Sequence, residues 1–362
     1  MSAGQKSSVY LRRSPFLISY WLDNQLVFEN YLTRKKVSAF PQVTAILDFF
    51  TAWTKAEETF HHWPQYSPDS LLKAVGRLLR ETLLEGSRRK NPPEAEPQKA
   101  LRKWGAWNPA AGFFHLSTKD IYAKEVTPEE IAFIEQLAKT HTVPKPLKAY
   151  PGARAIPLKR GDGSGEFSRV LRDRRTWREF SRREVALGTL STLLDLSFAV
   201  QAWENVPTIG RLAQKTSPSG GALHPSEAYV LTRRVEGVAQ GIYHYDAGGH
   251  RLQRLKVGAS AAEIQRYLAG QWWFRDAAFV VFLTAVFGRT QWKYDYARAY
   301  RAILIEAGHL CQTFCLTATW LGLAPFCTIA LADTQIEKSL GLDGISESVI
   351  YAMGAGHKPD KK

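Results

Sequence analysis

Cysteine is scarce in this chain. Its 362 residues include 3 cysteines, at positions 311, 315 and 327. An odd and low number argues against a disulfide-stapled scaffold and suits a reducing compartment. The first residues, MSAGQKSSVYLRRSPF, lack the apolar core of a secretory signal. We therefore expect a cytoplasmic protein.

Long uninterrupted apolar runs are also lacking. The longest apolar stretch covers residues 299–323 and is broken by Arg301, Glu306, His309 and Gln312. Charged side chains are costly inside a bilayer. The stretch therefore predicts a buried helix of a soluble protein and no membrane span.

Signatures of nucleic-acid binding are missing, although the chain is basic. Lys and Arg number 48 against 34 Asp and Glu, which gives a net charge of +14. A basic surface attracts polyanions, but no helix-turn-helix, zinc-knuckle or RNA-binding motif accompanies the charge. We favour a soluble protein with a basic surface over a nucleic-acid-binding protein.

The apolar content, 45% of the residues, is sufficient for about two domains in a chain of this length. The polar, proline-bearing segment 86–103 predicts a linker. It ends an N-terminal module, residues 1–103. A helical connector, residues 104–165, and a C-terminal domain, residues 166–362, follow. In the connector, the capping-box pattern of Thr127 and Glu130 predicts a helix over 127–141.

The N-terminal module begins with a predicted β-hairpin. Residues 16–32 contain two apolar runs separated by the turn-prone pair Asp23-Asn24. A helix is predicted next, from apolar spacing at Val43, Ile46, Leu47 and Phe50. A second amphipathic helix is predicted over about Asp69–Glu85. A hairpin with two helices suggests a small winged-helix-like module.

The C-terminal domain mixes predicted helices and strands. Residues 167–200 predict a helix, a short extended segment and a second helix. Strands are predicted in AYVLTRR, QGIYHYD, RLQRLKV, DAAFVVFLTAVF and SVIYAMGAG, and the fourth is apolar enough for a central strand. Together with the long buried helix, this order predicts an α+β domain.

The first candidate motif is Arg174-Arg175-Thr176 followed by Arg178. Guanidinium groups bind phosphate through bidentate, charge-assisted hydrogen bonds, and the Thr hydroxyl adds a donor. Taken alone, the run is better explained as a solvated basic turn, because clustered Arg is common on a basic surface.

The second motif is SPSGGALHP, residues 217–225. The adjacent Gly220 and Gly221 let main-chain N–H groups approach a flat ring or an anion, and Ser219 offers a hydroxyl. No Gly-Lys-Ser/Thr follows, so this is not a Walker loop. A tight surface turn is the alternative. Because such a turn rarely needs so many small residues, we favour ligand contact.

The third motif is Trp292-Lys293-Tyr294-Asp295. The reference pKa is about 10.4 for Lys and about 10 for Tyr. Either side chain needs burial or a neighbouring cation to act as a base near neutral pH. The alternative is the exposed start of an amphipathic helix.

The long helix contains further polar and small residues. Glu306 and His309 lie one turn apart and could pair, and Gly308 suggests close approach of a neighbouring helix or a ligand. Cys311 and Cys315 share a helix face. Two thiols without further ligands at fitting spacing make a poor metal site, so we predict core packing and no metal.

Taken in order, these segments resemble the SagB-type dehydrogenases, the thiazoline/oxazoline oxidases among the nitroreductase-like FMN proteins. The similar segments are RRTWREFSRREVALGTLSTLL, SPSGGALHPSEAYVL, GIYHYD, WKYDYARAYRAILIEAGHLCQTFCLTATWLGLAP and LGLDGISESVIYAMGAG. They extend over most of residues 166–357. The resemblance implies a nitroreductase-like fold, FMN as the cofactor, and a homodimer with FMN at the subunit interface.

The resemblance also implies roles for individual residues. Lys293 and Tyr294 match the pair held responsible for proton abstraction in the azoline oxidases. The segment Cys327–Ala330 is bulkier than the Pro-Ile-Gly-Gly-like run that family members carry beside the flavin. The positions that match FMN contacts are Arg174, Arg175, Thr176, Arg178, Ser219, Gly220, Gly221, Thr328, Ile329, Ala330 and Lys358.

The implied activity is FMN-dependent oxidation of azoline rings to azoles in a ribosomally synthesised peptide. This activity implies a peptide substrate, a cyclodehydratase partner and an N-terminal module that holds the peptide or the partner. The second hypothesis is a nicotinamide-driven nitro- or quinone-type reductase, or a flavin dehydrogenase acting on another peptide or small molecule. The third is a non-enzymatic peptide-binding protein.

Overall fold

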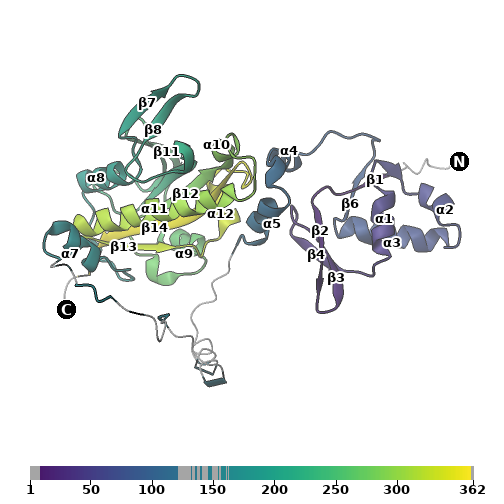
Figure 1. The fold of residues 1–362 in the computed structure, drawn as a ribbon, viewed down its shortest axis with the longest axis horizontal. Coiled ribbons are helices and arrows are strands. Elements are labelled where there is room, and N and C mark those ends of the chain that lie inside the picture. Colours follow the sequence, from purple (N-terminus) through teal and green to yellow (C-terminus); the bar gives the residue numbers. More distant parts are fainter. Residues whose placement is uncertain are drawn as a thin grey trace. The chain divides into compact units, whose positions relative to one another are not determined.

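The computed structural model describes residues 9–120 and 163–359, together with scattered residues between 132 and 161. The chain divides into two compact units (Figure 1). The first comprises residues 1–119 and 291–300, and the second comprises residues 120–290 and 301–362. Most of the helix predicted over 127–141 lies outside the described residues.

The first unit combines short strands with helices. Its elements are β1 (Tyr10–Arg13), β2 (Leu17–Leu22), β3 (Gln25–Asn30), β4 (Lys35–Ser38), α1 (Val43–Phe49), β5 (Thr54–Lys55), α2 (Glu58–His62), α3 (Pro68–Arg80), β6 (Leu84–Ser87), α4 (Glu96–Arg102), η1 (Gly105–Trp107) and α5 (Ala110–Ser117). The strands form two sheets, in the orders β2-β3-β4 and β5-β1-β6.

The predicted hairpin is confirmed as β2 and β3. Asp23 and Asn24 connect the strands, with φ of 48° and 60°. A two-residue turn with both residues in the left-handed region matches the twist of the flanking strands, and Asp and Asn tolerate that region well. The description of the module as winged-helix-like stays a prediction.

The helix predicted over about 69–85 ends earlier than expected. α3 begins after Ser67, whose side chain accepts a hydrogen bond from the Ser70 main-chain N–H, and it ends at Arg80. Thr82 has a φ of 59°, which is incompatible with a continuing right-handed helix. Leu84 then pairs with Arg13 in β1, so Leu83 and Leu84 are buried in the core between the sheet and α3 without being part of the helix.

The segment predicted as a linker, 86–103, includes the end of β6 and all of α4. Leu101 and Trp107 have no exposed surface, and Trp104 is 2% exposed. Burial of such large side chains is strongly favourable, so the N-terminal part of the first unit continues past residue 103 to Lys119.

The second unit is built on one large sheet. Its elements are α7 (Glu166–Asp173), α8 (Leu187–Phe198), β7 (Ala202–Val206), β8 (Gly210–Gln214), η2 (Gly220–Ala222), β9 (Ser226–Thr232), β10 (Gly241–Asp246), β11 (Arg251–Val257), α9 (Ala261–Tyr267), η3 (Trp272–Phe274), β12 (Phe279–Val286), α10 (Phe287–Gln291), α11 (Ala299–Trp320), β13 (Leu323–Thr328), α12 (Asp333–Leu340) and β14 (Glu347–His357).

The sheet order is β11-β10-β9-β12-β14-β13, and every neighbouring pair is antiparallel. β12 is buried along nearly its whole length. Phe279 and Val281 join a cluster that includes α8 and α11, whereas Val280 and Phe282 join a cluster that includes α9 and α12. The helices therefore cover both faces of the sheet, which explains the continuous apolar run and confirms the predicted α+β class.

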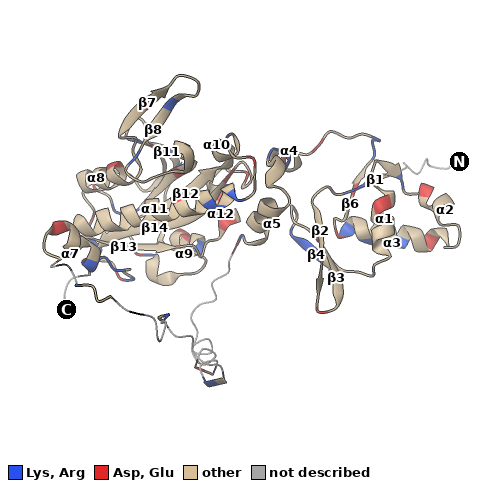
Figure 2. Ribbon diagram, viewed as in Figure 1, with Lys and Arg blue, Asp and Glu red and all other residues tan. Residues whose placement is uncertain are grey.

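Charged residues are distributed over the whole described chain (Figure 2). Lys and Arg are found in both units and are not concentrated in one segment (Figure 2). Within the described residues, no helix has the length and apolar character needed to cross a membrane.

Candidate functional site

The Arg motif lies on an extended segment that follows α7 along the edge of the sheet. The Trp177 main-chain N–H donates a 3.0 Å hydrogen bond to the Pro325 carbonyl of β13, and the Ser181 N–H donates one of 3.0 Å to the His357 carbonyl of β14. Arg174 is partly buried, and Arg178 is exposed. The segment is thus fixed by hydrogen bonds of its backbone. The Arg178 side chain, which lies between the two anchored residues, stays available to bind a ligand.

Positive charge accumulates on this segment without acidic partners. None of the salt bridges within the described residues includes Arg174, Arg175 or Arg178. Arg175 folds back and donates to the Arg174 carbonyl at 2.8 Å. Lys358 Nζ lies 5.3 Å from the centre of the Trp177 ring, which places a further cation beside the motif. Such a group of unpaired cations suits a phosphate.

The SGG loop is held by a buried carboxylate on α11. Ser219 Oγ donates to one oxygen of Glu306, and Ser226 Oγ donates to the other at 2.9 Å. Ser219 Oγ also accepts a 3.0 Å hydrogen bond from the His224 main-chain N–H. Glu306 is 3% exposed. Because a buried carboxylate without partners is very costly, these bonds fix the loop against the helix.

The two glycines of the loop differ in what they require. Gly221 has a φ of 69°, a conformation that favours glycine. Gly220 has an ordinary backbone, and a Cβ there would lie 3.5 Å from the Cβ of Ala302 on α11. A side chain larger than a methyl would therefore crowd the helix, and the loop surface stays flat.

The predicted pairing of Glu306 with His309 is wrong, because both residues bind the SGG segment instead. Glu306 accepts from the two serines, and His309 Nδ1 lies 3.4 Å from the Pro218 carbonyl oxygen. A Cβ on Gly308 would meet no atom within 4 Å in the described part of the chain. We predicted that a helix or a ligand approaches Gly308 closely. No such helix is found among the described residues of a single copy.

A polar network that the sequence did not reveal lies behind the loop. Arg289 donates to the His224 carbonyl at 2.9 Å and forms a 2.5 Å ion pair with Glu227. Glu227 also bonds His244 at 2.9 Å. Burial, together with the Lys215 and Arg289 charges, lowers the pKa of His224 to about 4, so His224 is neutral at neutral pH. The pKa of Lys215 is lowered by burial, and the Glu227 and Glu306 charges offset only part of this effect.

The loop at 327–330 is fixed through the buried side chain of Gln271. Gln271 Nε2 lies 3.1 Å from Thr328 Oγ1 and donates to the Ala330 carbonyl at 3.0 Å. The Ala330 N–H donates to Thr328 Oγ1 at 3.1 Å, so this N–H has a partner within the loop. Ile329 is 67% exposed. A flat ligand would therefore contact an apolar side chain and the main chain of this loop.

Lys293 and Tyr294 belong to the first compact unit, whereas the other predicted site residues belong to the second. Lys293 Nζ lies 5.4 Å from the centre of the Tyr294 ring, a cation–π geometry. The Tyr294 carbonyl accepts a 2.8 Å hydrogen bond from Nε1 of the fully buried Trp107. The segment 104–107, predicted as part of a connector, thus holds the backbone of the pair.

Tyr300 anchors the other end of the same segment. Its hydroxyl lies 3.0 Å from Nδ1 of the buried His115. Its ring contacts Trp104 and Trp107, with ring centres 6.1 Å apart in both cases. Residues 291–300 are therefore attached to the helical part of the first unit at two points, through Tyr294 and Tyr300.

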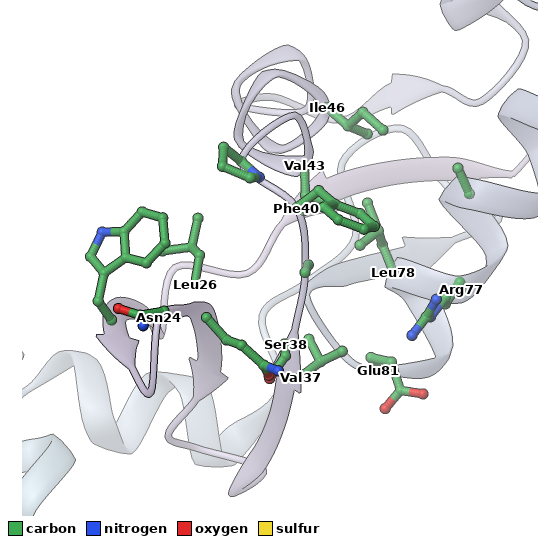
Figure 3. A pocket seen from close by; sticks show the side chains of 15 residues that line it. Asn24, Leu26, Val37, Ser38, Phe40, Val43, Ile46, Arg77, Leu78 and Glu81 are labelled. Atoms are coloured by element: carbon green, nitrogen blue, oxygen red, sulfur yellow. The ribbon is translucent and has the colours of Figure 1, made fainter.

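The first unit also contains an apolar groove of about 500 Å³ beside β4. Figure 3 shows side chains that line this groove, among them Arg77 of α3, Glu81 just after that helix, and Phe40 and Val43. No sequence pattern predicted this groove. The lining residues are Trp21, Asn24, Gln25, Leu26, Val37, Ser38, Ala39, Phe40, Pro41, Val43, Ile46, Ala74, Arg77, Leu78 and Glu81.

The C-terminal half of the chain resembles a known protein family. Residues 171–357 match the model of the nitroreductase family. The chain is 28% identical over 173 residues to the trifolitoxin-processing protein TfxB of Rhizobium leguminosarum bv. trifolii, which covers 47% of this chain and 46% of TfxB. It is 31% identical over 189 residues to MJ1384 of Methanocaldococcus jannaschii, named as a nitroreductase, over 52% of this chain and 89% of that protein.

A third relative is, like TfxB, named as a processing protein. The microcin B17-processing protein McbC of Escherichia coli is 30% identical over 151 residues, which is 40% of this chain and 55% of McbC. The chain therefore spans about half the length of TfxB and McbC. The family match includes the Arg motif, the SGG loop, the Lys293-Tyr294 pair and the loop at 327–330. The match over more than half of the chain and the helix-covered antiparallel sheet show that this protein belongs to the nitroreductase family.

Proposed function

We propose that the protein is an FMN-dependent dehydrogenase that oxidises azoline rings to azoles in a ribosomally synthesised peptide. Family membership supports a flavin-type oxidoreductase. The names of TfxB and McbC, both peptide-processing proteins, support a peptide substrate. The observation on which the proposal depends is the Lys293-Tyr294 pair, which supplies a base that simple reduction of a substrate does not require.

The residues of the second unit fit FMN. Arg174, Arg178 and Lys358 provide cations for its phosphate, and the segment 219–221 offers a flat surface for its ring system. The chemistry that FMN supplies when bound is acceptance of two electrons as a hydride. The chain itself must bind the peptide, remove a proton and keep the ring in position.

Proton removal is assigned to Lys293 and Tyr294. The carbon next to the azoline nitrogen loses its proton to one of these side chains while the neighbouring carbon gives up a hydride, so the ring loses two hydrogens in total. The Trp107 hydrogen bond fixes the Tyr294 backbone, which lowers the entropic cost of presenting the base. Lys293 Nζ lies over the Tyr294 ring, which keeps the two side chains together.

Substitution of the pair separates cofactor binding from catalysis. Lys293→Ala and Tyr294→Phe should retain FMN and lose turnover by about 10²–10⁴-fold, the range expected for a general base. FMN content is measured by absorbance, and turnover by mass spectrometry of the azoline peptide. Tyr296→Phe, on a ring 6.0 Å from Tyr294, is the matched control and should stay active.

Two outcomes would contradict this assignment. Full turnover in both variants would exclude the pair as the base. Rapid bleaching of the flavin by NAD(P)H without peptide, with no azoline oxidation, would support the reductase hypothesis instead.

Loss of a phosphate-binding cation should weaken FMN binding. A charge-assisted hydrogen bond contributes about 1.5–3 kcal/mol, so Arg178→Ala should raise the FMN Kd by at least about tenfold. Flavin fluorescence titration of the apoprotein measures this value. Arg169→Ala on α7 removes a cation 4.0 Å from Glu166 and should leave the Kd unchanged. Equal Kd values for Arg178→Ala and the unsubstituted protein would remove Arg178 from the site.

The exposed face of α11 supports a homodimer. Ile305 is 59% exposed and Leu304 is 37% exposed, and the open position at Gly308 lies one turn further along the same face. Exposed apolar residues beside a small residue suit close packing of a second helix. The exposed Arg178 and Lys358 would then be covered by a second copy, as a flavin at a subunit interface requires.

A charge on this face should dissociate the dimer. Ile305→Glu should shift the mass measured by light scattering from that of two chains toward that of one, because a buried unpaired carboxylate is costly. Val257→Glu changes a residue that is 74% exposed on β11 and should keep the dimer. A monomeric unsubstituted protein would exclude the homodimer.

The groove of the first unit is proposed to hold an extended segment of the substrate peptide. β4 ends its sheet, so a peptide strand can add main-chain hydrogen bonds there while its side chains enter the groove. None of the salt bridges in the described chain includes Arg77 at the rim, so an acidic peptide residue fits beside apolar ones. The proposed partner is the cyclodehydratase that forms the azoline ring before this enzyme oxidises it.

A change in the groove should affect binding more than chemistry. Phe40 is 81% exposed, so Phe40→Glu should not disturb folding. It should raise KM for the full peptide by about tenfold or more, as loss of an interface anchor does, and leave kcat unchanged. With a small azoline compound that is too short to reach the groove, Phe40→Glu should leave both KM and kcat unchanged. Tyr66→Glu, at an exposed site outside the groove, is the control. An unchanged KM for Phe40→Glu would exclude the groove.

A further inference from the structure

All three cysteines of the chain meet at one point in the second unit. Cys311 and Cys315 lie four residues apart on α11, and Cys327 lies on β13. Their sulfur atoms are all within 4.8 Å of one another. The prediction of core packing without a metal considered the helix pair alone, because a third thiol on the following strand has no characteristic spacing.

The surroundings of the three sulfurs are largely apolar. Cys311 and Cys315 are each 4% exposed and belong to the core cluster between α11 and the sheet. Cys327 is partly buried and packs against that cluster. The Tyr351 hydroxyl donates a 3.5 Å hydrogen bond to Cys327 Sγ. The partly open side at Cys327 gives an ion a path to the sulfurs.

The spacing of the sulfurs is compatible with coordination of one ion by all three thiols. A central ion with metal–sulfur bonds of about 2.3 Å in a trigonal arrangement separates its sulfurs by about 4 Å. A disulfide needs about 2.05 Å and a narrow range of dihedral angles. Separations below 4.8 Å for all three pairs therefore need a small adjustment for the ion, and three sulfurs converge where a disulfide would use two.

We propose that Cys311, Cys315 and Cys327 form a three-coordinate thiolate site for a soft, closed-shell cation, Cu(I). Thiolates select soft cations such as Cu(I). No His, Asp, Glu or fourth Cys in the described residues joins the three sulfurs, whereas structural zinc sites use four ligands. Each coordinating thiol releases its proton as the metal binds.

A cation lies near two of the three sulfurs, because the Arg174 charge acts on both Cys315 and Cys327. The Arg174 charge also partly balances the negative charge of the thiolates. A bound ion would tie the end of β13, and with it the loop at 327–330, to α11.

Copper binding is tested on the reduced full-length protein. Under anaerobic conditions it should bind one equivalent of Cu(I) in competition with a Cu(I)-chelating dye. Loss of a residue that only hydrogen-bonds to a metal ligand weakens metal binding by roughly 10–100-fold. Loss of a ligand should weaken Cu(I) binding by more than this in each of the variants Cys311→Ser, Cys315→Ser and Cys327→Ser. Tyr351→Phe removes such a partner and should lie within that range. Bound Cu(I) should also raise the Tm of the unsubstituted protein and leave that of Cys327→Ser unchanged.

Several results would overturn the proposal. Equal Cu(I) affinity in the Cys327→Ser variant, which changes the most exposed of the three thiols, would exclude the site even if the two helix variants failed to fold. Displacement of Cu(I) by one equivalent of Zn(II) would exclude the copper assignment. A single free thiol after mild air oxidation, counted in denaturant, would assign a disulfide to this place.

Discussion

The buried carboxylate of Glu306 is the constraint on which the candidate site depends. A charge at 3% exposure is tolerated when hydrogen bonds replace its water. Here the replacements are hydroxyls of Ser219 and Ser226, one in the SGG loop and one at the start of β9. Helix, loop and strand are therefore joined at a single group, and loss of any of these partners would leave a costly unsatisfied atom.

The same helix organises most of the second unit. Toward its start, α11 fixes the SGG loop through Glu306, and one face remains exposed at Leu304 and Ile305. Toward its end it presents Cys311 and Cys315 to Cys327 on β13. A rigid helix that contacts two loops can keep them at a constant separation, which a flat rigid cofactor requires.

Much of the fold was predictable where one local rule acts alone. The apolar run 279–286 identified β12 because burial on both faces removes any alternation, and Asp23-Asn24 identified a hairpin because few residue pairs adopt that turn. β13 was missed because LAPFCT is short and contains proline. The β7–β8 hairpin was missed because its mostly exposed strands have no buried face to produce a pattern.

Parts of the candidate site were beyond sequence reasoning for a different physical reason. Ser219 was singled out as a ligand contact, yet its hydroxyl is used by Glu306, which lies 87 residues away in the chain. The Gln271 bonds that shape the loop at 327–330 and the third thiol at Cys327 likewise come from distant positions. Such contacts follow from strand order and not from local spacing.

The attachment of residues 291–300 to the first unit limits how this unit can be exchanged in evolution. This unit is discontinuous in sequence: the chain leaves it after Lys119 and returns for ten residues. The groove beside β4 and the Lys293-Tyr294 pair are therefore parts of one body, joined through Trp107 and Tyr300. The first unit is not an appendage that can be exchanged at a single junction, because replacing residues 1–119 would remove the packing that holds residues 291–300.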